Sequence, residues 1–255
     1  MRVKYGIAVE GLNGSAGGTT ASRNKSREYF KIRTAPRNPR TVDQSVARGR
    51  LAGISKSWGA LTEAQRTQWD EFAKTQKGRR VLGVAGVLSG FNAFSRIGLN
   101  LALLDKPALL NPPTSTVIPE LIESVVEITA AGVISIGAKA IVPTIDGGEN
   151  VFTFGYQLVV EMTPILPDGR ASDKSALRVI AIGAQGQSSV APGGIMDIRA
   201  VEVSDLFTAK YGSKLAPGDK VQIALKAIGV DAGYFGVSTL KLYDTVIIPN
   251  LPAGE

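Results

Sequence analysis

The sequence of 255 residues contains no cysteine and no histidine. Without cysteine there is no disulfide framework, no thiolate nucleophile and no cysteine-ligated zinc or iron–sulfur site. Without histidine, the Ser-His-Asp triad, imidazole metal ligands and the commonest general base near neutral pH are excluded as well. Enzymes that use only carboxylates, lysine or tyrosine stay possible, such as a two-carboxylate glycosidase. We therefore expect a protein that is not an enzyme, with no catalytic, cofactor-binding or metal-binding residues.

Long apolar runs are also missing. The most apolar stretches, residues 81–88 and 97–104, are far too short to cross a bilayer. The first fifteen residues contain no continuous apolar segment of the secretory type. Aromatic residues are few, at 6%, whereas 29 glycines indicate many turns, as a β-rich region needs. We expect a chain that is made and used in soluble form, with no membrane partner.

Acidic side chains are scarce in residues 1–100, where 18 Lys and Arg face 6 Asp and Glu, for a net charge of +12. Residues 101–255 contain 11 Lys and Arg and 16 Asp and Glu, for a net charge of −5. Such asymmetry indicates two modules with different surroundings. Seven of the basic residues lie between positions 23 and 40, where only Glu28 opposes them.

The basic residues of the N-terminal segment permit three interpretations. They can contact nucleic-acid phosphates, dock onto an acidic protein surface, where arginine is favoured, or keep a positive surface solvated. Tyr29 and Phe30 are the only aromatics among them, too few for a platform that stacks bases. We favour docking onto protein, with nucleic acid as a secondary partner. The candidate anchoring residues are Arg23, Lys25, Arg27, Lys31, Arg33, Arg37, Arg40, Arg48 and Arg50.

The first forty residues predict an extended arm. The glycine-rich run 11–18 indicates a flexible or closely fitting loop. Residues 27–34 alternate between apolar and polar side chains, as a short strand does. Pro36 and Pro39 then favour a rigid, extended connector to the next segment.

Three helices are predicted in residues 41–105. Thr41 and Thr62 each precede a glutamine by three residues, the spacing of a capping box, and Ser89 is expected to begin the third helix. Residues 78–88 are expected to form a glycine-punctuated apolar loop between the second and third helices. Apolar residues at steps of three and four predict a shared helical core. Its predicted members are Leu51, Ile54, Trp58, Trp69, Phe72, Phe91 and Phe94.

Beyond Asp105, four prolines mark the best candidate for a domain boundary. Seven β-favouring runs follow, at 124–129, 132–142, 150–163, 176–184, 196–204, 220–228 and 237–248. Seven short strands in about 135 residues are typical of an antiparallel sandwich. The sequence therefore predicts an α+β protein. Its expected parts are an arm at 1–40, a helical module at 41–105, a linker at 106–118 and a β-sandwich domain of the immunoglobulin or fibronectin-III type at 119–255.

Two loop patterns that could carry chemistry fail in detail. The run Gly17-Gly18-Thr19 lacks the lysine of a phosphate-binding loop and follows no strand that leads into a helix. Carboxylates in predicted turns, among them Asp146, Asp168 and Asp231, lack the D-x-D-x-D-G spacing of a calcium loop. Turn formation is the simpler account of these residues.

The first hundred residues resemble a loosely defined, largely uncharacterised set of proteins encoded in tailed bacteriophages, prophages and some bacteria. The resemblance covers roughly residues 5–104. It rests on Asn38-Pro39-Arg40-Thr41, Gln44, Arg48, Trp58, Leu61-Thr62, Gln65-Arg66, Trp69 and Gly90-Phe91-Asn92-Ala93-Phe94. It implies a setting, the structural-gene region of phages. Separately, residues 215–246 are similar to the last two strands of a fibronectin-III or immunoglobulin-like module, which often decorates phage capsids and tails.

These features predict a structural protein of a bacteriophage virion, either an auxiliary capsid (decoration) protein or a head–tail component. Its basic arm and helices would anchor it to neighbouring virion subunits. The expected partners are other virion proteins and further copies of the chain, with no small-molecule substrate. The alternatives are a tail or neck component of the virion, and a DNA-binding protein that uses the basic N-terminal segment. The expected location is the virion, after synthesis in the host cytoplasm.

Overall fold

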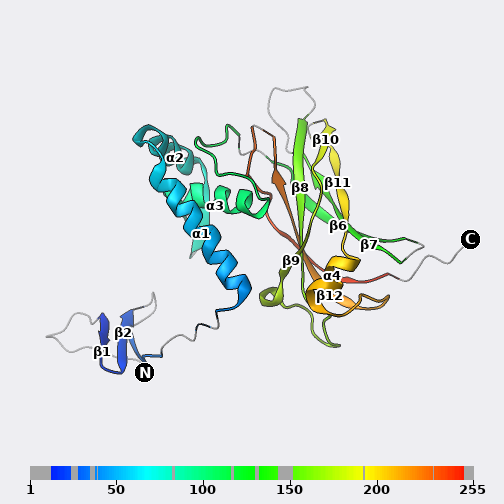
Figure 1. Cartoon of the computed structure of the whole chain (residues 1–255), viewed down its shortest axis with the longest axis horizontal. Helices are drawn as coiled ribbons and strands as arrows, with labels where there is room; N and C mark the ends of the chain where they lie inside the picture. The colour runs from blue at the N-terminus through cyan, green and yellow to red at the C-terminus, as the bar shows by residue number, and fades with distance from the viewer. Residues whose placement is uncertain are drawn as a thin grey trace, which may run out of the picture. The chain divides into compact units, whose positions relative to one another are not determined.

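The computed structural model describes residues 13–23, 28–34, 38, 40–81, 84–115, 118–129, 132–142, 152–191, 193–231 and 233–249. By compactness the chain divides into two units, residues 1–47 and residues 48–255. Figure 1 shows both units and labels most of their helices and strands.

The first unit contains a three-stranded antiparallel sheet, here called the N-terminal sheet. Strand β1 (Gly14–Ala16) pairs with β2 (Thr19–Arg23), and β2 pairs with β3 (Glu28–Ile32). The chain turns from β1 into β2 through Gly17-Gly18, and Gly17 has a φ of +56°, which glycine adopts without steric cost. The strand predicted at the end of the arm is confirmed by β3. The prediction of a loop at 11–18 is wrong at residues 14–16, which form β1, whereas Gly17 and Gly18 are the turn of the hairpin. Residues 11 and 12 lie outside the described residues.

Helices α1 (Val42–Ala60), α2 (Glu63–Thr75) and α3 (Gly90–Leu103) are the three predicted helices. Thr62 forms a complete capping box with Gln65 at the start of α2, and Ser89 caps α3. At α1 only half of the box is present. Thr41 Oγ1 accepts a bond from the backbone N–H of Gln44, whereas Gln44 Oε1 has no hydrogen-bond partner.

The segment between α2 and α3 differs from the prediction. It forms a two-stranded antiparallel hairpin of β4 (Lys77–Val81) and β5 (Val84–Val87) rather than a loop. Valine favours extended backbone, and three valines lie in these strands. The glycines between them hide the alternation from which a strand is usually predicted.

The helices enclose a small aromatic core. Trp69 and Phe94 are fully buried and meet edge to face, with ring centroids 5.2 Å apart. Trp58 packs against Phe94 at 5.3 Å and against Phe91 at 5.8 Å. The indole N–H of Trp69 donates to the backbone oxygen of Leu110 at 3.1 Å. The cluster also includes buried Ile54 and half-buried Phe72, so six of the seven predicted core residues pack here.

Leu51 is the exception, and its prediction as a core residue was wrong. Its side chain is 46% exposed, although helical spacing puts it on the same face as Ile54 and Trp58. Helix α1 buries only Ile54. At the level of Leu51, the residues that face Gly98, Ala102 and Ala108 are Arg50 and Gly53, so the covered face of the helix is rotated away from Leu51. Periodicity predicts which residues share a face but not which part of that face is covered.

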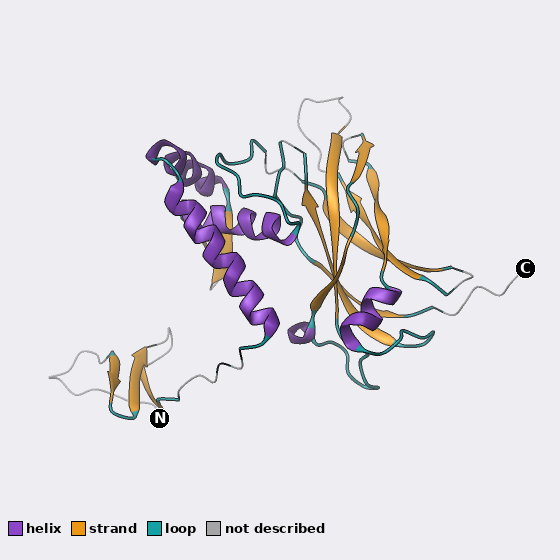
Figure 2. Ribbon diagram, in the orientation of Figure 1, coloured by secondary structure: helices purple, strands orange, loops and turns teal. Residues whose placement is uncertain are grey.

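Two larger antiparallel sheets make up most of the second unit (Figure 2). The first, here called the β7 sheet, has the order β11-β7-β6 and consists of β6 (Glu120–Ile128), β7 (Ile134–Ile141) and β11 (Ile195–Glu202). The second, here called the β12 sheet, has the order β10-β8-β12-β13, with β9 also paired to β8. It consists of β8 (Phe152–Met162), β9 (Arg178–Ile182), β10 (Gly186–Val190), β12 (Lys220–Gly229) and β13 (Leu242–Ile247).

The two larger sheets share one hydrophobic core. Alternate residues of β7, such as Ile136, and of β8 and β12, such as Leu158 and Ile223, are fully buried in it. Helix α4 (Ser204–Tyr211) adds Phe207, which is also fully buried. A short 3₁₀ turn, Lys174–Ala176, precedes β9.

The predicted combination of helices and antiparallel strands is confirmed. The described residues form four α-helices and only antiparallel strand pairs, with no barrel. Each of the seven predicted strands beyond residue 119 has a counterpart, whereas β10 and α4 were not predicted. The finer prediction of a sandwich of about seven strands is not confirmed.

The segment predicted as a linker, 106–118, packs closely where it is described. Ala108 and Leu109 contact the helical core, and the backbone N–H of Ser115 donates to Gly233 O at 3.0 Å. Phe235 also packs against the helical core from the turn before β13. The helices and the two larger sheets are therefore joined within the second compact unit.

Candidate interaction surface

The structure places the predicted anchoring residues on several elements. Those with exposed side chains are Lys31, Arg33, Arg40 and Arg48, and Arg50 is half-buried. Lys25, Arg27, Arg37 and the side chain of Arg23 lie outside the described residues. The exposed cations thus come from the end of β3, from the residue before Thr41 and from the first half of α1.

The N-terminal sheet has one mainly apolar and one polar face. Its strand register puts Ala21, Phe30 and Ile32 on the same side, together with Thr19. Tyr29 and Lys31 lie on the opposite side, where the hydroxyls of Ser15 and Thr20 also form a hydrogen bond. The sheet is therefore amphipathic in the way of a sheet that covers a core.

No core lies under that apolar face among the described residues 13–47. None of their side chains is buried where burial is described, and Ile32 is 82% exposed. A small sheet needs a packed hydrophobic face or a helix against it to be stable by itself. The N-terminal sheet therefore carries the features of an element that is completed by a partner.

Helix α1 also leaves apolar side chains in solvent. Val42 is 79% exposed, and Val46 and Leu51 are each 46% exposed. Arg48 is exposed on the same half of the helix. Exposed apolar side chains rimmed by charge are typical of protein–protein contact surfaces.

The outer face of the β7 sheet, turned away from the shared core, is acidic. Its described carboxylates are Glu120, Glu123, Glu127, Asp197 and Glu202. The cations of these strands are Lys139, on the same face, and Arg199, which lies in the register shift of β11. The register aligns Glu127 with Ser135 and Ser135 with Glu202, and Lys139 bonds Glu123 at 3.0 Å. Glu123 raises the pKa of Lys139 through this hydrogen bond and its charge. Five carboxylates against two cations give this face a net negative charge.

A polar cluster joins α3 to the β12 sheet. Lys226 Nζ donates to Asn100 Oδ1 at 2.9 Å, and Asn100 Nδ2 donates to Gly236 O at 2.9 Å. Burial lowers the pKa of Lys226 to about 8, with a further lowering by the charge of Lys241 and a partial offset by Glu161. Lys241 and Glu161 form an ion pair at 2.6 Å. These contacts tie a helix to a sheet, which is a structural role.

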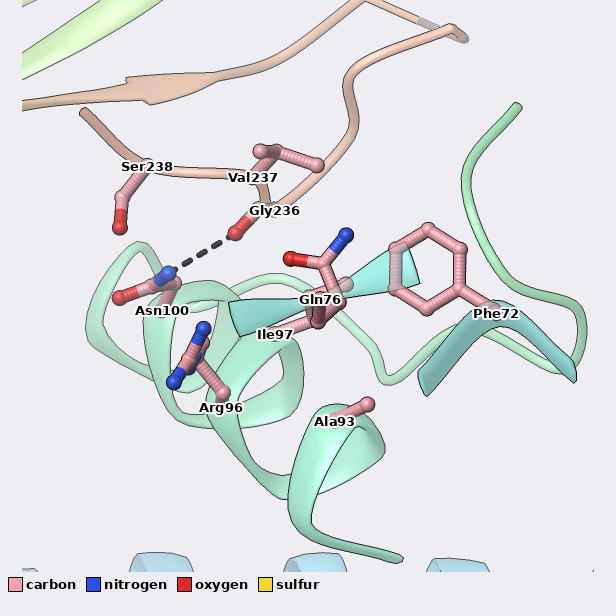
Figure 3. Close-up of a pocket in the computed structure, with 9 residues that line it drawn as sticks. All are labelled: Phe72, Gln76, Ala93, Arg96, Ile97, Asn100, Gly236, Val237 and Ser238. Carbon is pink, nitrogen blue, oxygen red and sulfur yellow. Dashed lines mark hydrogen bonds between the residues drawn. The ribbon is translucent and has the colours of Figure 1, made fainter. Parts of the chain in front are cut away.

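A small pocket lies beside this cluster (Figure 3). Its lining includes Gln76, Arg96, Asn100 and Gly236, and it holds about 50 Å³. That space suits one or two water molecules, whereas pockets for drug-sized ligands hold roughly 300–1,000 Å³. This pocket is therefore a poor candidate for a substrate site.

Within the described residues, no group of three or more carboxylates is placed to hold a metal ion. None of the helices described is both long and apolar enough to cross a membrane.

Comparisons with known proteins gave no match to any family model, curated protein or solved structure. The sequence resemblance to phage structural proteins therefore stays an expectation.

The acidic face was missed at the sequence level for a specific reason. The predicted strand began at residue 124, so Glu120 and Glu123 lay outside it, and strict alternation along the longer β6 would assign these two residues to opposite faces. A register shift between Leu121 and Glu123 puts both on the outer face. The sequence shows the excess of acidic residues after position 100. It does not show that these residues share one face, because that depends on the register shift in β6.

Proposed function

We propose that this chain is a structural protein of a bacteriophage particle, anchored to neighbouring subunits by its N-terminal segment. The observation that carries the proposal is the N-terminal sheet. It has formed strands and one apolar face, yet none of its described side chains is buried. An auxiliary capsid or head–tail component suits such a chain. In either position, a segment that buries few side chains by itself would pack against neighbouring subunits of the particle.

The second unit is the folded body that the N-terminal segment would attach to the particle. It has two hydrophobic cores of its own, one among the helices and one between the two larger sheets. We propose that the two larger sheets act as a sandwich-like module of the immunoglobulin or fibronectin-III kind, which projects or makes further contacts. A structural rather than catalytic role agrees with the lack of histidine and cysteine.

A DNA-binding role is the candidate from a different class. It draws support from the exposed Lys31, Arg33 and Arg40 and from the basic composition of residues 23–40. Binding through phosphates would fall steeply as salt rises, by about tenfold or more for each few-fold increase in salt concentration. A titration with duplex DNA at two salt concentrations separates this role from an anchor.

Deletion of residues 1–40 tests the anchoring role. The deletion removes the N-terminal sheet but retains Thr41, the cap of α1, and both cores of the second unit. We expect an unchanged unfolding temperature for the remaining fold and a loss of incorporation into particles. A matched control replaces residues 1–40 with a glycine–serine segment of equal length. Incorporation of either variant at the level of the intact chain would contradict the proposal.

A further inference from the structure

One end of the outer face of the β7 sheet carries an apolar patch. Ile141 of β7 and Ile195 of β11 are cross-strand partners on this face, and their side chains are 39% and 60% exposed. Ile122, in the register shift of β6, is 45% exposed at the same end of the sheet. Exposed apolar side chains that lie next to one another are typical of a contact surface. Ile141 and Ile195 are here called the isoleucine patch.

Carboxylates lie beside the isoleucine patch. Glu120 of β6 is the cross-strand partner of Ile141. In the next row of the same face, Glu123 and Asp197 lie on either side of Lys139. Among the described residues, neither Glu120 nor Asp197 takes part in an ion pair. A partner for the patch therefore needs apolar side chains with positive charge beside them.

The first two turns of α1 have this chemistry. Val42 and Val46 are one helical turn apart and lie on one face, where they are 79% and 46% exposed. Four basic residues lie between positions 40 and 60, against the single carboxylate of Asp43. The positive end of the helix dipole is also at the start of α1. The start of α1 is therefore an apolar face in a positively charged segment.

The helices and the isoleucine patch lie on opposite sides of the two larger sheets. On β12, Ile223 faces the shared core, whereas Lys226 points the other way and bonds Asn100 of α3. The helices therefore cover the outer face of the β12 sheet, and the outer face of the β7 sheet is the far side of the same body (Figure 1). Because Ile54 holds α1 in the helical core, a contact between α1 and an isoleucine patch joins two copies of the chain.

We propose that the first two turns of α1 in one copy dock onto the isoleucine patch of a second copy. Val42 and Val46 then cover Ile141 and Ile195, and the basic residues of α1 lie among the carboxylates beside the patch. Burial of the four apolar side chains and the opposite charges around them both favour the contact. Each copy offers one helix and one patch, so the contact is head to tail and builds rings or chains of subunits. The inference rests on the proposed structural role and names a second copy of the chain as one partner.

Two complementary variants test the contact. The helix variant carries Val42→Asp and Val46→Asp, and the patch variant carries Ile141→Lys and Ile195→Lys. All four side chains are exposed, so both variants should keep the unfolding temperature of the intact chain. Each variant alone should self-associate at least about tenfold more weakly than the intact chain in analytical ultracentrifugation, because apolar contact is lost and like charges meet. The control Leu206→Asp, at an exposed side chain of α4, should associate as the intact chain does.

A mixture of the two variants tests the head-to-tail geometry. The patch variant keeps an intact helix and the helix variant keeps an intact patch, so an equimolar mixture should form a one-to-one dimer and nothing larger. A mixture that associates no more strongly than either variant alone would overturn the proposal. The same conclusion follows if the intact chain stays monomeric up to its solubility limit, or if either variant associates as strongly as the intact chain.

Disulfide trapping locates the contact, because the chain has no cysteine of its own. A tagged chain with Val46→Cys is oxidised together with untagged chains that carry Ile141→Cys or Ile195→Cys. We expect a tagged–untagged disulfide for at least one of these two positions, and none for the exposed control Leu206→Cys. Cross-linking no greater than that of the control overturns the proposal. A disulfide that closes within a single chain carrying both cysteines also overturns it, because α1 then reaches its own patch.

These results are separable from the proposed function, because deletion of residues 1–40 retains Val42 and Val46. If the deletion prevents incorporation but the two variants form no mixed dimer, the head-to-tail contact is wrong and the structural role stands. If the mixed dimer forms but the deletion leaves incorporation unchanged, anchoring by the N-terminal segment is wrong and the contact between copies stands.

Discussion

Replacing Lys226 by methionine should change how the stability of the fold depends on pH. Lys226 is largely buried between α3 and the β12 sheet, and its pKa falls from 10.5 to about 8 on folding. That difference corresponds to roughly 3 kcal/mol. Between pH 8 and 10.5 the unfolded chain binds a proton at this position that the folded chain has released. The folded state should therefore gain stability as pH rises through this window.

The sign of the effect follows from the lowered pKa. Below pH 8 the ammonium is charged in both states, and the folded protein carries the whole unfavourable burial of that charge. Above pH 10.5 the amine is neutral in both states and this unfavourable contribution is gone. Methionine has a similar length and no charge, so the variant should lack this increase. The variant also lacks the hydrogen bond from Lys226 Nζ to Asn100 Oδ1, and this loss shifts the free energy of unfolding by a nearly constant amount between pH 7 and pH 11.

Urea denaturation at half-unit steps from pH 7 to pH 11 provides the measurement. The quantity of interest is the free energy of unfolding of the intact chain minus that of the Lys226→Met variant, since titration of the other lysines and tyrosines cancels. We expect this difference to rise by about 2–3 kcal/mol between pH 7.5 and 10.5. A difference that stays flat, or that falls with pH, would refute the account of Lys226 as a buried charge.

Four further substitutions test the helical core and the N-cap of α2. Phe94→Ala should destabilise the fold by about 3–5 kcal/mol, because the side chain is fully buried against two tryptophans, whereas Leu51→Ala should cost less than about 1 kcal/mol. Equal losses in urea denaturation would show that Leu51 is a core residue after all. Thr62→Ala should cost about 1 kcal/mol through loss of the capping box, and Thr62→Ser should restore most of it. Equal stability of these two variants would count against the cap.

Local signals predicted the helices well. Thr41, Thr62 and Ser89 each mark a helix start, because a side-chain oxygen that satisfies a free backbone N–H is needed wherever a helix begins. The aromatic residues of α2 and α3 fall at helical spacing, and most of them pack together. These features depend on residues within one or two turns of each other, which a sequence shows directly.

Features that depend on distant residues were harder to predict. Lys226 alternates along β12 as a solvent-facing residue would, yet its side chain is largely buried and bonded to Asn100 of α3. Leu51 has the periodicity of a core residue, yet its side chain is 46% exposed. In both cases the burial of a side chain depends on how a helix is placed by tertiary packing, which no local pattern records.

The glutamates on the outer face of β6 were also hard to predict from the sequence. The excess of positive charge in the first hundred residues was evident from composition, and it pointed to the N-terminal segment as a contact. The negative face of the β7 sheet was not evident, because it needs three strands in register and a local register shift in two of them, β6 and β11. Charge complementarity between two parts of the chain could be recognised only once both were seen as sheets.

The central claim is that the N-terminal sheet obtains its packing from a neighbouring subunit. Hydrogen exchange of the amides in β2 and β3 measures this directly, in the isolated chain at low concentration and in the assembled state. The account predicts fast exchange in the isolated chain, because no described side chain of that sheet is buried, and slow exchange on assembly. Exchange in the isolated chain as slow as that of β7 and β12, with no change on assembly, would contradict it.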